Sequence, residues 1–589
     1  MRRAGPRDAV VVLLPALLFA ALHLPALDYE LVWTDEPEIV NGSILRPPGR
    51  ILHAFAEPLH ASHDFAASPF SQPYYRPLQV VTASSLAAAF GRAPRVFRSA
   101  NLLLGAVTAA LFTALAAALL RSRSAGLLAG SLWAAHPVGL EIYVWVGGLA
   151  AALAGCAVVA SLVGGVRSWR SATRAGRLGW AALALLALVV GLLSKENAAV
   201  IPGLQLALVL GLAASEGGRG IRGHAPAAVL VAAQAAIVAG YLFALRPAVL
   251  GTTFTGAAPI GGHMSVQWLT SLATWPELFA WLWLPIQSST SDAVRVVTTP
   301  ADAGAALGAA LLLASALLWL VLLRRGHGSA ATALAWLWIA FLPTSGLAPL
   351  LHARAERNLF LSAFGAALLA ACAVQGLRLR RVPAPALVAV AIAAVLALCE
   401  RTLHRQPDWR STAALFERDT ARDPRHREGR LNLVAAYVKS GDLAAAKRAV
   451  DVLVGQRRPD GWTSYALDAS LVEAACLVNA AVDADADTLA MVERDPPAGG
   501  VASMPGFYTC FAHALEREGH HRRALEIHQT LHRLAPTADT ADHALGAARC
   551  HAALGEREQA LGWLARIDPA RARPELMRQV QALRAQLAR

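Results

Sequence analysis

The chain has 589 residues, of which 56% are hydrophobic and only 16% are charged, and its formal net charge is +13 at pH 7. The length exceeds one compact domain, and the hydrophobic excess, concentrated before about residue 400, excludes a wholly soluble protein. The positive charge does not indicate a nucleic-acid partner, because the arginines form short clusters between apolar runs and not one basic patch.

The first part of the chain, residues 1–402, predicts a polytopic membrane domain built of α-helices. Apolar runs of about 17–25 residues recur along it, which is the length that crosses a bilayer. The runs expected to span lie at 9–27, 97–120, 124–139, 145–166, 178–194, 196–215, 225–245, 304–323, 330–350, 358–376 and 383–400. They predict about eleven crossings.

Two weaker apolar pieces are not counted as spans. Leu78–Phe90 is only about 13 residues long and lies in the long segment 28–96, so we expect a helix that lies along the membrane interface. Ser265–Ile286 is rich in Trp and contains Pro276, and we interpret it as re-entrant or interfacial.

The arginine clusters predict the orientation. They fall on the side of the N-terminus, which the positive-inside rule assigns to the cytoplasm. The clusters are Arg121/Arg123, Arg167–Arg177, Arg219/Arg222, Arg324/Arg325 and Arg378–Arg381. Segment 28–96 is then the first extracytoplasmic loop, and the chain after residue 402 is extracytoplasmic as well. The first helix also resembles a secretory signal, but we expect it to be retained, because the acidic pair Asp35-Glu36 needs an anchor at the membrane.

The remainder, residues 403–589, is charged and amphipathic and predicts a helical repeat domain. Gly441, Gly519 and Gly555 are each followed five residues later by an alanine. Small residues at such positions let two antiparallel helices close on each other, and the separation of residues 519 and 555 is close to one tetratricopeptide period. We therefore expect a tetratricopeptide-type α-solenoid, which either binds a protein or serves as a lid or spacer. The six cysteines show no metal-site spacing, and we interpret them as core residues.

Ionisable residues gather at the helix ends that this topology places on the outer face. Asp35 and Glu36 follow the first helix, and the others flank later segments: Arg76, His136, Glu141, Lys195, Glu196, Arg354, Glu356 and Arg357. Taken singly, each is compatible with an ordinary helix end or a local ion pair. Together they indicate a substrate site, because charged groups at membrane depth need partners and usually serve a function.

The chemistry that fits such a site is glycosyl transfer from a lipid carrier. Sugar nucleotides stay in the cytoplasm, so an outward-facing site needs a membrane-borne donor such as a polyprenyl-phosphate sugar. An acceptor hydroxyl has to lose its proton as it attacks, and Asp35 is the expected base. The cations expected to stabilise the departing phosphate are Arg354, Arg357 and Lys195. The carboxylates expected to orient these cations are Glu141, Glu196 and Glu356.

Five short motifs occur in a fixed order: Asp35-Glu36, Tyr75-Arg76-Pro77-Leu78, His136 to Glu141, Leu193 to Glu196, and Ala355 to Arg357. Together with the repeat tail, they resemble the transmembrane and tetratricopeptide repeat-containing (TMTC-type) protein O-mannosyltransferases of the GT-C glycosyltransferase superfamily. The resemblance covers nearly the whole chain.

This resemblance implies a GT-C-type helical fold and a dolichyl- or undecaprenyl-phosphate sugar donor, with mannose as the sugar. It implies inverting transfer to a Ser/Thr hydroxyl of a protein, with no metal and no other cofactor. The family commonly has Asp-Asp where this chain has Asp35-Glu36, which leaves open which carboxylate is the base. Asn358 and Phe360 stand where tyrosines often follow the family's Glu-Arg pair. The Ala/Arg-rich composition indicates a bacterial protein of the inner membrane.

Two other functions remain open on the sequence. A non-catalytic membrane anchor could present the repeats as a scaffold for assembling envelope proteins, and the outer-face charges would then be dispensable. A transporter of lipid-linked sugars would need matching polar groups at the inner helix ends, and the sequence shows none.

Overall fold

The computed structural model describes residues 6–60, 74–215, 225–252, 258–286, 289–379, 382–456, 461–463, 468–497, 499–534, 540–570 and 572–589. In these residues nearly all regular structure is helical, and one short antiparallel strand pair is present, β1 (Val294–Arg295) with β2 (Trp462–Thr463). The all-α prediction is confirmed. The predicted cluster Arg219/Arg222 and the last two residues of Arg378–Arg381 lie outside the described residues.

The chain divides into two compact units, residues 1–422 with 461–463, and residues 423–460 with 464–589. The boundary predicted at residue 402 falls inside α16 (Ala384–Arg405). The first unit continues through η12 (Gln406–Arg410) and α17 (Thr412–Arg422). Buried ion pairs of Arg405 with Asp408 and Asp419 hold these elements to the end of α16.

The first unit is a bundle of membrane helices. Nine helices of the described residues are long and apolar enough to cross a bilayer, so the chain is a multi-pass membrane protein. Their helical cores are α1 (Pro6–His23), α4 (Pro94–Leu120), α7 (Leu149–Arg170), α8 (Arg174–Ser194), α9 (Ile201–Ser215), α10 (Ala225–Gly240), α13 (Ala303–Arg324), α15 (Phe360–Leu379) and α16.

Two of the eleven predicted crossings are shorter helices. α5 (Arg123–Ala135) has 13 residues and α14 (Gly328–Phe341) has 14. At a rise of about 1.5 Å per residue, each covers about 20 Å of a hydrocarbon core that is about 30 Å thick. Both pack inside the bundle, α5 against α4 and α15, and α14 against α9 and α15. Neighbouring helices therefore cover much of their apolar surface.

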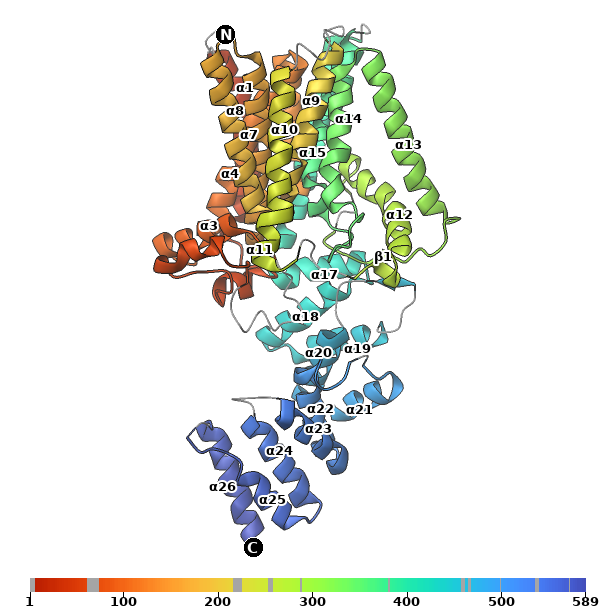
Figure 1. The fold of residues 1–589 in the computed structure, drawn as a ribbon. Coiled ribbons are helices and arrows are strands. Elements are labelled where there is room, and N and C mark those ends of the chain that lie inside the picture. The colour runs from red at the N-terminus through yellow and green to blue at the C-terminus, as the bar shows by residue number, and fades with distance from the viewer. Residues whose placement is uncertain are drawn as a thin grey trace. The chain divides into compact units, whose positions relative to one another are not determined.

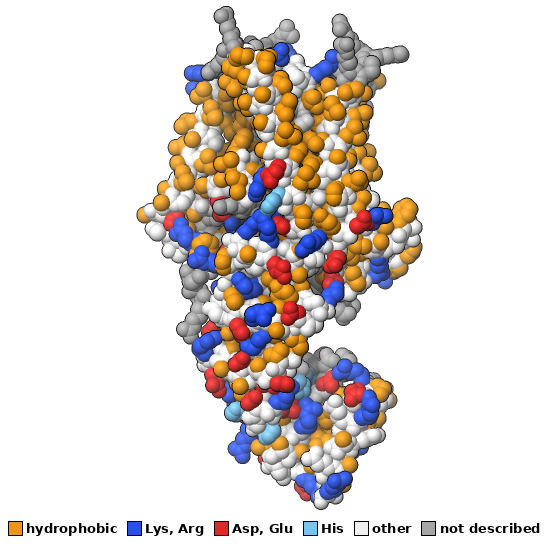
Figure 2. Space-filling model, turned by 180° about the vertical axis from the view of Figure 1, so that it is seen from behind, with side chains coloured by type: hydrophobic (Ala, Val, Ile, Leu, Met, Phe, Trp, Pro, Cys, Tyr) orange, Lys and Arg blue, Asp and Glu red, His pale blue; other side chains and the backbone are white. Residues whose placement is uncertain are grey.

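Side-chain exposure shows which helices face lipid. On α13 and α16, Leu313 and Val390 are 61% and 62% exposed, which suits contact with hydrocarbon chains. On α7, by contrast, a Cβ added at Gly155 would collide with Phe360, so this helix packs closely against its neighbours. Figure 2 shows hydrophobic side chains over the bundle and charged side chains gathered where that apolar band ends.

The two weaker apolar pieces form α3 (Pro77–Phe90) and α12 (Met264–Trp283). α3 packs against η3 (Pro48–Phe55), and neither helix is among the nine candidate spans. Trp275 of α12 donates a hydrogen bond to the carbonyl oxygen of Ser345 at 2.8 Å. Both helices lie toward the end of the bundle opposite the N-terminus (Figure 1). Their interfacial placement stays a prediction.

Short helical turns occur in the segments that connect the spans. They are η1 (Leu24–Asp28), η2 (Glu36–Val40), η4 (Pro137–Gly139), α6 (Leu140–Tyr143), η5 (Val146–Gly148), η6 (Glu196–Val200), η10 (Leu342–Thr344) and η11 (Glu356–Leu359). Because helix ends leave backbone N–H and C=O groups without intrahelical partners, these turns offer hydrogen bonds to side chains and ligands. The predicted site residues therefore lie on or beside these breaks.

The second unit consists of paired antiparallel helices. The pairs are α18 (Arg427–Ser440) with α19 (Leu443–Gly455), α20 (Asp468–Ala481) with α21 (Asp485–Arg494), α22 (Pro505–Arg517) with α23 (His521–Leu534), and α24 (Thr540–Ala553) with α25 (Arg557–Leu564), followed by α26 (Pro574–Ala588). Gly441, Gly519 and Gly555 turn the chain at positive φ between the helices of three pairs. The assignment to the tetratricopeptide type stays a prediction.

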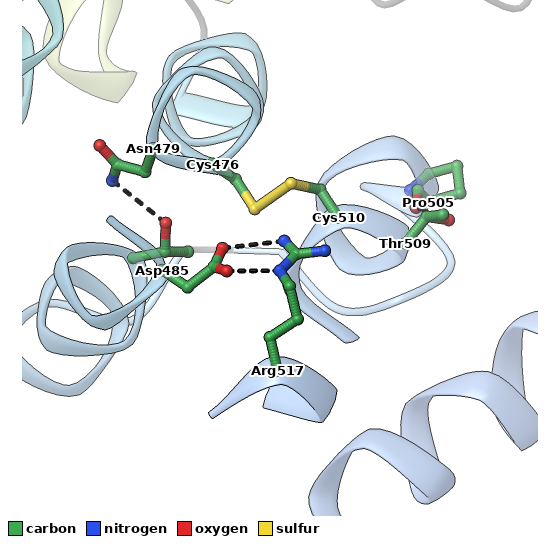
Figure 3. The surroundings of a disulfide bond; sticks show 8 residues. Cys476, Asn479, Asp485, Pro505, Thr509, Cys510 and Arg517 are labelled. Atoms are coloured by element: carbon green, nitrogen blue, oxygen red, sulfur yellow. Dashed lines mark hydrogen bonds and ion pairs between the residues drawn. A yellow bond between two sulfur atoms is a disulfide. The ribbon is translucent and has the colours of Figure 1, made fainter. Parts of the chain in front are cut away.

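A disulfide bond joins Cys476 of α20 to Cys510 of α22, with the Cα atoms 6.2 Å apart. Figure 3 shows the ion pair of Asp485 and Arg517 beside it. Both cysteines are buried core residues, as the sequence predicts, but the sequence did not predict that they are bonded to each other. They are 34 residues apart in the sequence, and only the packing of α20 on α22 brings them together.

Candidate functional site

Asp35 is fully buried and is held by the backbone of two segments. Its Oδ2 accepts hydrogen bonds from the N–H groups of Val32 at 3.0 Å and Val146 at 3.4 Å, and its Oδ1 accepts one from Gly147 at 2.8 Å. Burial raises the pKa of Asp35 to about 6, and these hydrogen bonds oppose the shift. The group is therefore mainly a carboxylate at neutral pH.

The backbone beside Asp35 adopts an uncommon conformation. Trp33 has φ 62°, which is strained for a bulky residue, and its ring stacks on Trp145 with the centroids 5.0 Å apart. Its N–H donates to the hydroxyl of Thr412 at 3.0 Å. Glu36, the second predicted catalytic carboxylate, is only partly buried. Of the pair, Asp35 is thus the more rigidly placed and Glu36 the more accessible.

Glu38 is a second buried carboxyl group in this loop, and the sequence reading did not select it. Its Oε2 has no hydrogen-bond partner among the described residues. Burial and the nearby charge of Asp35 raise the pKa of Glu38 to about 8, so it is mainly protonated at neutral pH. The only signal in the sequence was its position, one helical turn after Asp35 in η2.

Arg76 and Glu196 form a two-pronged ion pair. Nη2 of Arg76 lies 2.9 Å from one Glu196 oxygen, and its Nε lies 3.3 Å from the other. The guanidinium also stacks on the ring of Tyr74, 4.1 Å from the centroid. These contacts fix the plane of the guanidinium. They leave some of its N–H groups available to donate hydrogen bonds to a ligand.

Lys195 lies next to this pair, between α8 and η6. No ion pair or hydrogen bond of its ammonium occurs among the described residues, although Arg76, Arg357 and Glu196 are all within electrostatic range. Burial and the neighbouring arginine Arg76 lower the pKa of Lys195 to about 7. An anion bound here would reverse this shift, because it would supply the missing counter-charge.

Glu141 and Arg357 form a second ion pair, between α6 and η11. Glu141 is fully buried, its carboxylate pairs with the Arg357 guanidinium, and its Oε2 accepts a hydrogen bond from the Arg357 N–H at 2.7 Å. Arg357 also lies over the ring of Trp33, 5.3 Å from its centroid. This contact connects the basic residues to the loop that carries Asp35.

Arg246 is a further cation that the sequence reading missed. It follows η8 (Tyr241–Leu245), begins α11 (Arg246–Leu250), is buried, and lies within electrostatic range of Tyr74, as Arg76 and Arg357 do. We call Arg76, Lys195, Arg246 and Arg357 the basic cluster. Two carboxylates lie within the cluster, Glu196 paired with Arg76 and Glu141 paired with Arg357. Cations gathered in this way suit a phosphate group.

Three predicted site residues make their contacts elsewhere. His136 accepts a hydrogen bond from the Val138 N–H and bonds the Leu282 carbonyl, so it caps a helix end. Arg354 pairs with Glu277 of α12 at 2.6 Å. Glu356 pairs with Arg405 at 3.2 Å and belongs to the buried network that holds α16 to α17.

Comparisons with known proteins show a likeness to a solved structure. No protein-family model matches the chain, and no curated protein matches it. Among solved structures, the chain is similar to ArnT from Cupriavidus metallidurans, whose structure was determined bound to undecaprenyl phosphate. The identity is 15%, the TM-score is 0.36, and the match covers 90% of this chain and 82% of ArnT. We therefore take the function from the residues of the site.

Proposed function

We propose that the chain is an integral-membrane glycosyltransferase that moves a sugar from a polyprenyl-phosphate donor to a hydroxyl acceptor on the extracytoplasmic face. The observation that carries the proposal is the basic cluster, in which the Lys195 ammonium forms no ion pair with any described residue, connected through the Arg357–Trp33 contact to a buried carboxylate. Cations for a phosphate and a carboxylate for a hydroxyl are the two groups that this reaction requires.

The basic cluster would bind the phosphate of the donor. A polyprenyl-phosphate sugar is a phosphodiester with one negative charge, and its leaving group gains a second charge when the bond to the sugar breaks. The fixed cations of the cluster attract the leaving phosphate more strongly as it gains this second charge, and that difference stabilises the transition state. Glu141 and Glu196 hold the guanidinium groups in place, and Lys195 contributes an ammonium that only the ligand would pair.

Asp35 would accept the proton of the acceptor hydroxyl. The hydroxyl oxygen attacks the anomeric carbon, the bond from that carbon to the phosphate oxygen breaks, and its electron pair leaves with the phosphate. Three of the four lone-pair positions of the Asp35 carboxylate are occupied by backbone N–H groups, and one remains on Oδ1. Because the side chain is enclosed, the proposal requires the segment around Trp33 to move when the acceptor binds.

For the substrates we propose mannose as the sugar and Ser/Thr of a protein as the acceptor. The paired helices of the second unit would hold that protein. We propose that the chain is a bacterial inner-membrane protein with its N-terminus in the cytoplasm. The disulfide between Cys476 and Cys510 supports an extracytoplasmic second unit, because disulfides persist in oxidising compartments.

A non-catalytic scaffold is the second candidate, and the enclosure of Asp35 favours it. Three backbone hydrogen bonds to one carboxylate are also what a purely structural loop anchor would show. This alternative predicts that the basic cluster is dispensable, and that only the second unit is needed.

Transfer of radiolabelled mannose from polyprenyl-phosphate-mannose tests the proposal. Membranes that contain the protein should label an endogenous protein or a Ser/Thr peptide, and membranes without it should not. The same assay with other lipid-linked sugars identifies the donor if mannose fails. Absence of transfer from every lipid-linked sugar in the panel would favour the scaffold.

A further inference from the structure

The second unit contains a compact group of imidazole and carboxylate side chains on three helices, which we call the histidine cluster. His513 and Glu516 lie on α22, one turn apart, His528 lies on α23, and Arg549 lies on α24. One potential ligand atom from each of His513, Glu516 and His528 lies within 4.8 Å of the other two. None of these residues belongs to the site proposed above.

His528 is placed for this contact by packing. It is fully buried, and a Cβ added at Gly546 would lie only 2.5 Å from its ring, so only a glycine admits the ring there. Its ring lies 5.2 Å from that of His513 and 5.9 Å from that of His543, measured between centroids.

The hydrogen bonds of the cluster compete for the same atoms. Nδ1 of His513 lies 3.2 Å from Oε1 of Glu516 and 3.3 Å from Nη2 of Arg549. If Nδ1 of His513 carries a proton, this N–H faces the N–H of Arg549, which is also a donor. If Nδ1 carries no proton, its lone pair faces the carboxylate oxygen of Glu516, which is also an acceptor. Nε2 of His528 lies 2.5 Å from the same Oε1. A cation between the three ligand atoms would satisfy their lone pairs together.

We propose that His513, Glu516 and His528 bind a divalent transition-metal ion, with Zn²⁺ as the best match. Two imidazoles and one carboxylate form a ligand set that zinc uses in proteins, with a fourth position left to water. Neighbouring ligand atoms of a tetrahedral zinc ion lie about 3.3 Å apart, which follows from bonds of about 2.0 Å. The separation of 3.2 Å between His513 and Glu516 fits, and the His528 contact has to lengthen.

Arg549 would support the metal ligand that it already contacts. Its Nε lies 2.7 Å from Oε2 of Glu516, and ligating carboxylates commonly have such an outer hydrogen bond. Its Nη2 lies 3.2 Å from Oε1, the oxygen that the ion would use, and would leave both this oxygen and His513 when the ion binds. The ion would join α22 to α23, so it would stabilise the second unit without taking part in sugar transfer.

Equilibrium dialysis of the intact, detergent-solubilised protein against Zn²⁺ tests the proposal. The wild type should bind one Zn²⁺ ion per chain. The His513→Gln variant should bind it at least about 10-fold more weakly. His513 is partly exposed, so the His513→Gln variant should fold. The matched control is His520→Gln, because His520 is exposed; this variant should bind Zn²⁺ like the wild type.

Thermal unfolding and Co²⁺ absorption are two further tests of the metal site. Zn²⁺ should raise the unfolding temperature of the wild type and of His520→Gln, but not that of His513→Gln. Co²⁺ bound to the wild type should show the absorption of a tetrahedral site. Equal Zn²⁺ affinity in the wild type and His513→Gln, or no bound ion in the wild type, would overturn the proposal.

Discussion

Lys195 lies in an environment that disfavours its positive charge, because it is buried and within electrostatic range of Arg76 and Arg357. The carboxylates Glu196 and Glu141 offset this only in part, and among the described residues the ammonium forms no ion pair or hydrogen bond that a bound anion would have to replace. We therefore expect Lys195→Met to weaken binding of the lipid-linked sugar by about 10- to 100-fold. A hydrogen bond to a charged group contributes about 1.5–3 kcal/mol, which corresponds to a change of this size. The Michaelis constant for the lipid donor measures the effect.

Lys439→Met, a change on α18 in the second unit, is the control for loss of a lysine. It should leave the Michaelis constant unchanged. An unaltered constant in Lys195→Met as well would show that the phosphate does not contact this ammonium.

Two pKa values predict the pH dependence of kcat/KM, which reports groups of the free enzyme. The rate should rise with pH through about 6, as Asp35 loses its proton and becomes a base. It should fall as pH rises through about 7, because Lys195 then loses the charge that attracts the donor. The phosphodiester of the donor does not titrate in this range. The expected profile is therefore a narrow bell.

Lys195→Arg separates the two limbs. Arginine stays charged throughout this range, so the alkaline limb should disappear while the acid limb remains. An alkaline limb that persists in this variant would assign it to a different group, for which Glu38, with its pKa of about 8, is the first alternative.

The sequence predicted which charged residues lie close together, but not how they pair. The motifs predicted that Arg76, Glu141, Lys195, Glu196 and Arg357 would share one end of the bundle, and the structure places them together. It could not show that Arg76 meets Glu196, since 120 residues separate them, or that Glu141 meets Arg357 across 216 residues. Such partners depend on helix packing, which no local pattern contains.

Two residues show what the sequence could not predict about the site. Glu356 was expected to orient a phosphate-binding cation, but it pairs with Arg405 in the buried network. Arg246 was not considered, because it stands alone after an apolar run, yet its helix brings it to the basic cluster. Spacing in the sequence identifies charged helix ends, and the tertiary fold decides which of them meet.

At the scale of elements, hydropathy predicted the apolar helices well but not which of them are short. α5 and α14 are as apolar as their neighbours, but they are short and packed among other helices. An apolar residue has the same hydropathy whether protein or lipid surrounds it. Composition alone therefore cannot distinguish a helix packed among other helices from one that faces lipid. The pattern also found the glycine turns of the second unit, where a positive φ requires glycine.

The disulfide joins two helix pairs of the second unit, and its removal should loosen that unit. Closing a loop of 34 residues typically stabilises a fold by about 2–4 kcal/mol. Cys510→Ser should therefore lower the unfolding temperature of the second unit, and reductant should do the same to the wild type. Thermal unfolding of the intact protein, followed by circular dichroism, measures both.

Cys399→Ser is the matched control, because Cys399 is a free cysteine on α16 in the first unit. It should leave the transition of the second unit in place. A wild type that is insensitive to reductant would contradict a structural role of the disulfide.

At the scale of the whole molecule, the chain has a membrane unit, which carries the basic cluster proposed to bind phosphate, and a second unit of paired helices. Arginine clusters at one end and the ionisable site residues at the other are what an outward-facing enzyme with a membrane-borne donor requires. The overall plan was accessible from composition and periodicity, because span length and charge asymmetry are properties of the sequence. The sugar and the acceptor depend on pocket shape, which the motifs do not encode.

The most direct test of the account compares mannose transfer in membranes that carry the wild type, Asp35→Asn or Glu36→Gln, with equal insertion confirmed by immunoblot. The account predicts that Asp35→Asn lowers transfer by at least about 100-fold, the contribution of a general base, while Glu36→Gln retains most activity. Loss of activity in Glu36→Gln alone would assign the base to Glu36. Transfer at the wild-type rate in both variants would contradict the proposed mechanism.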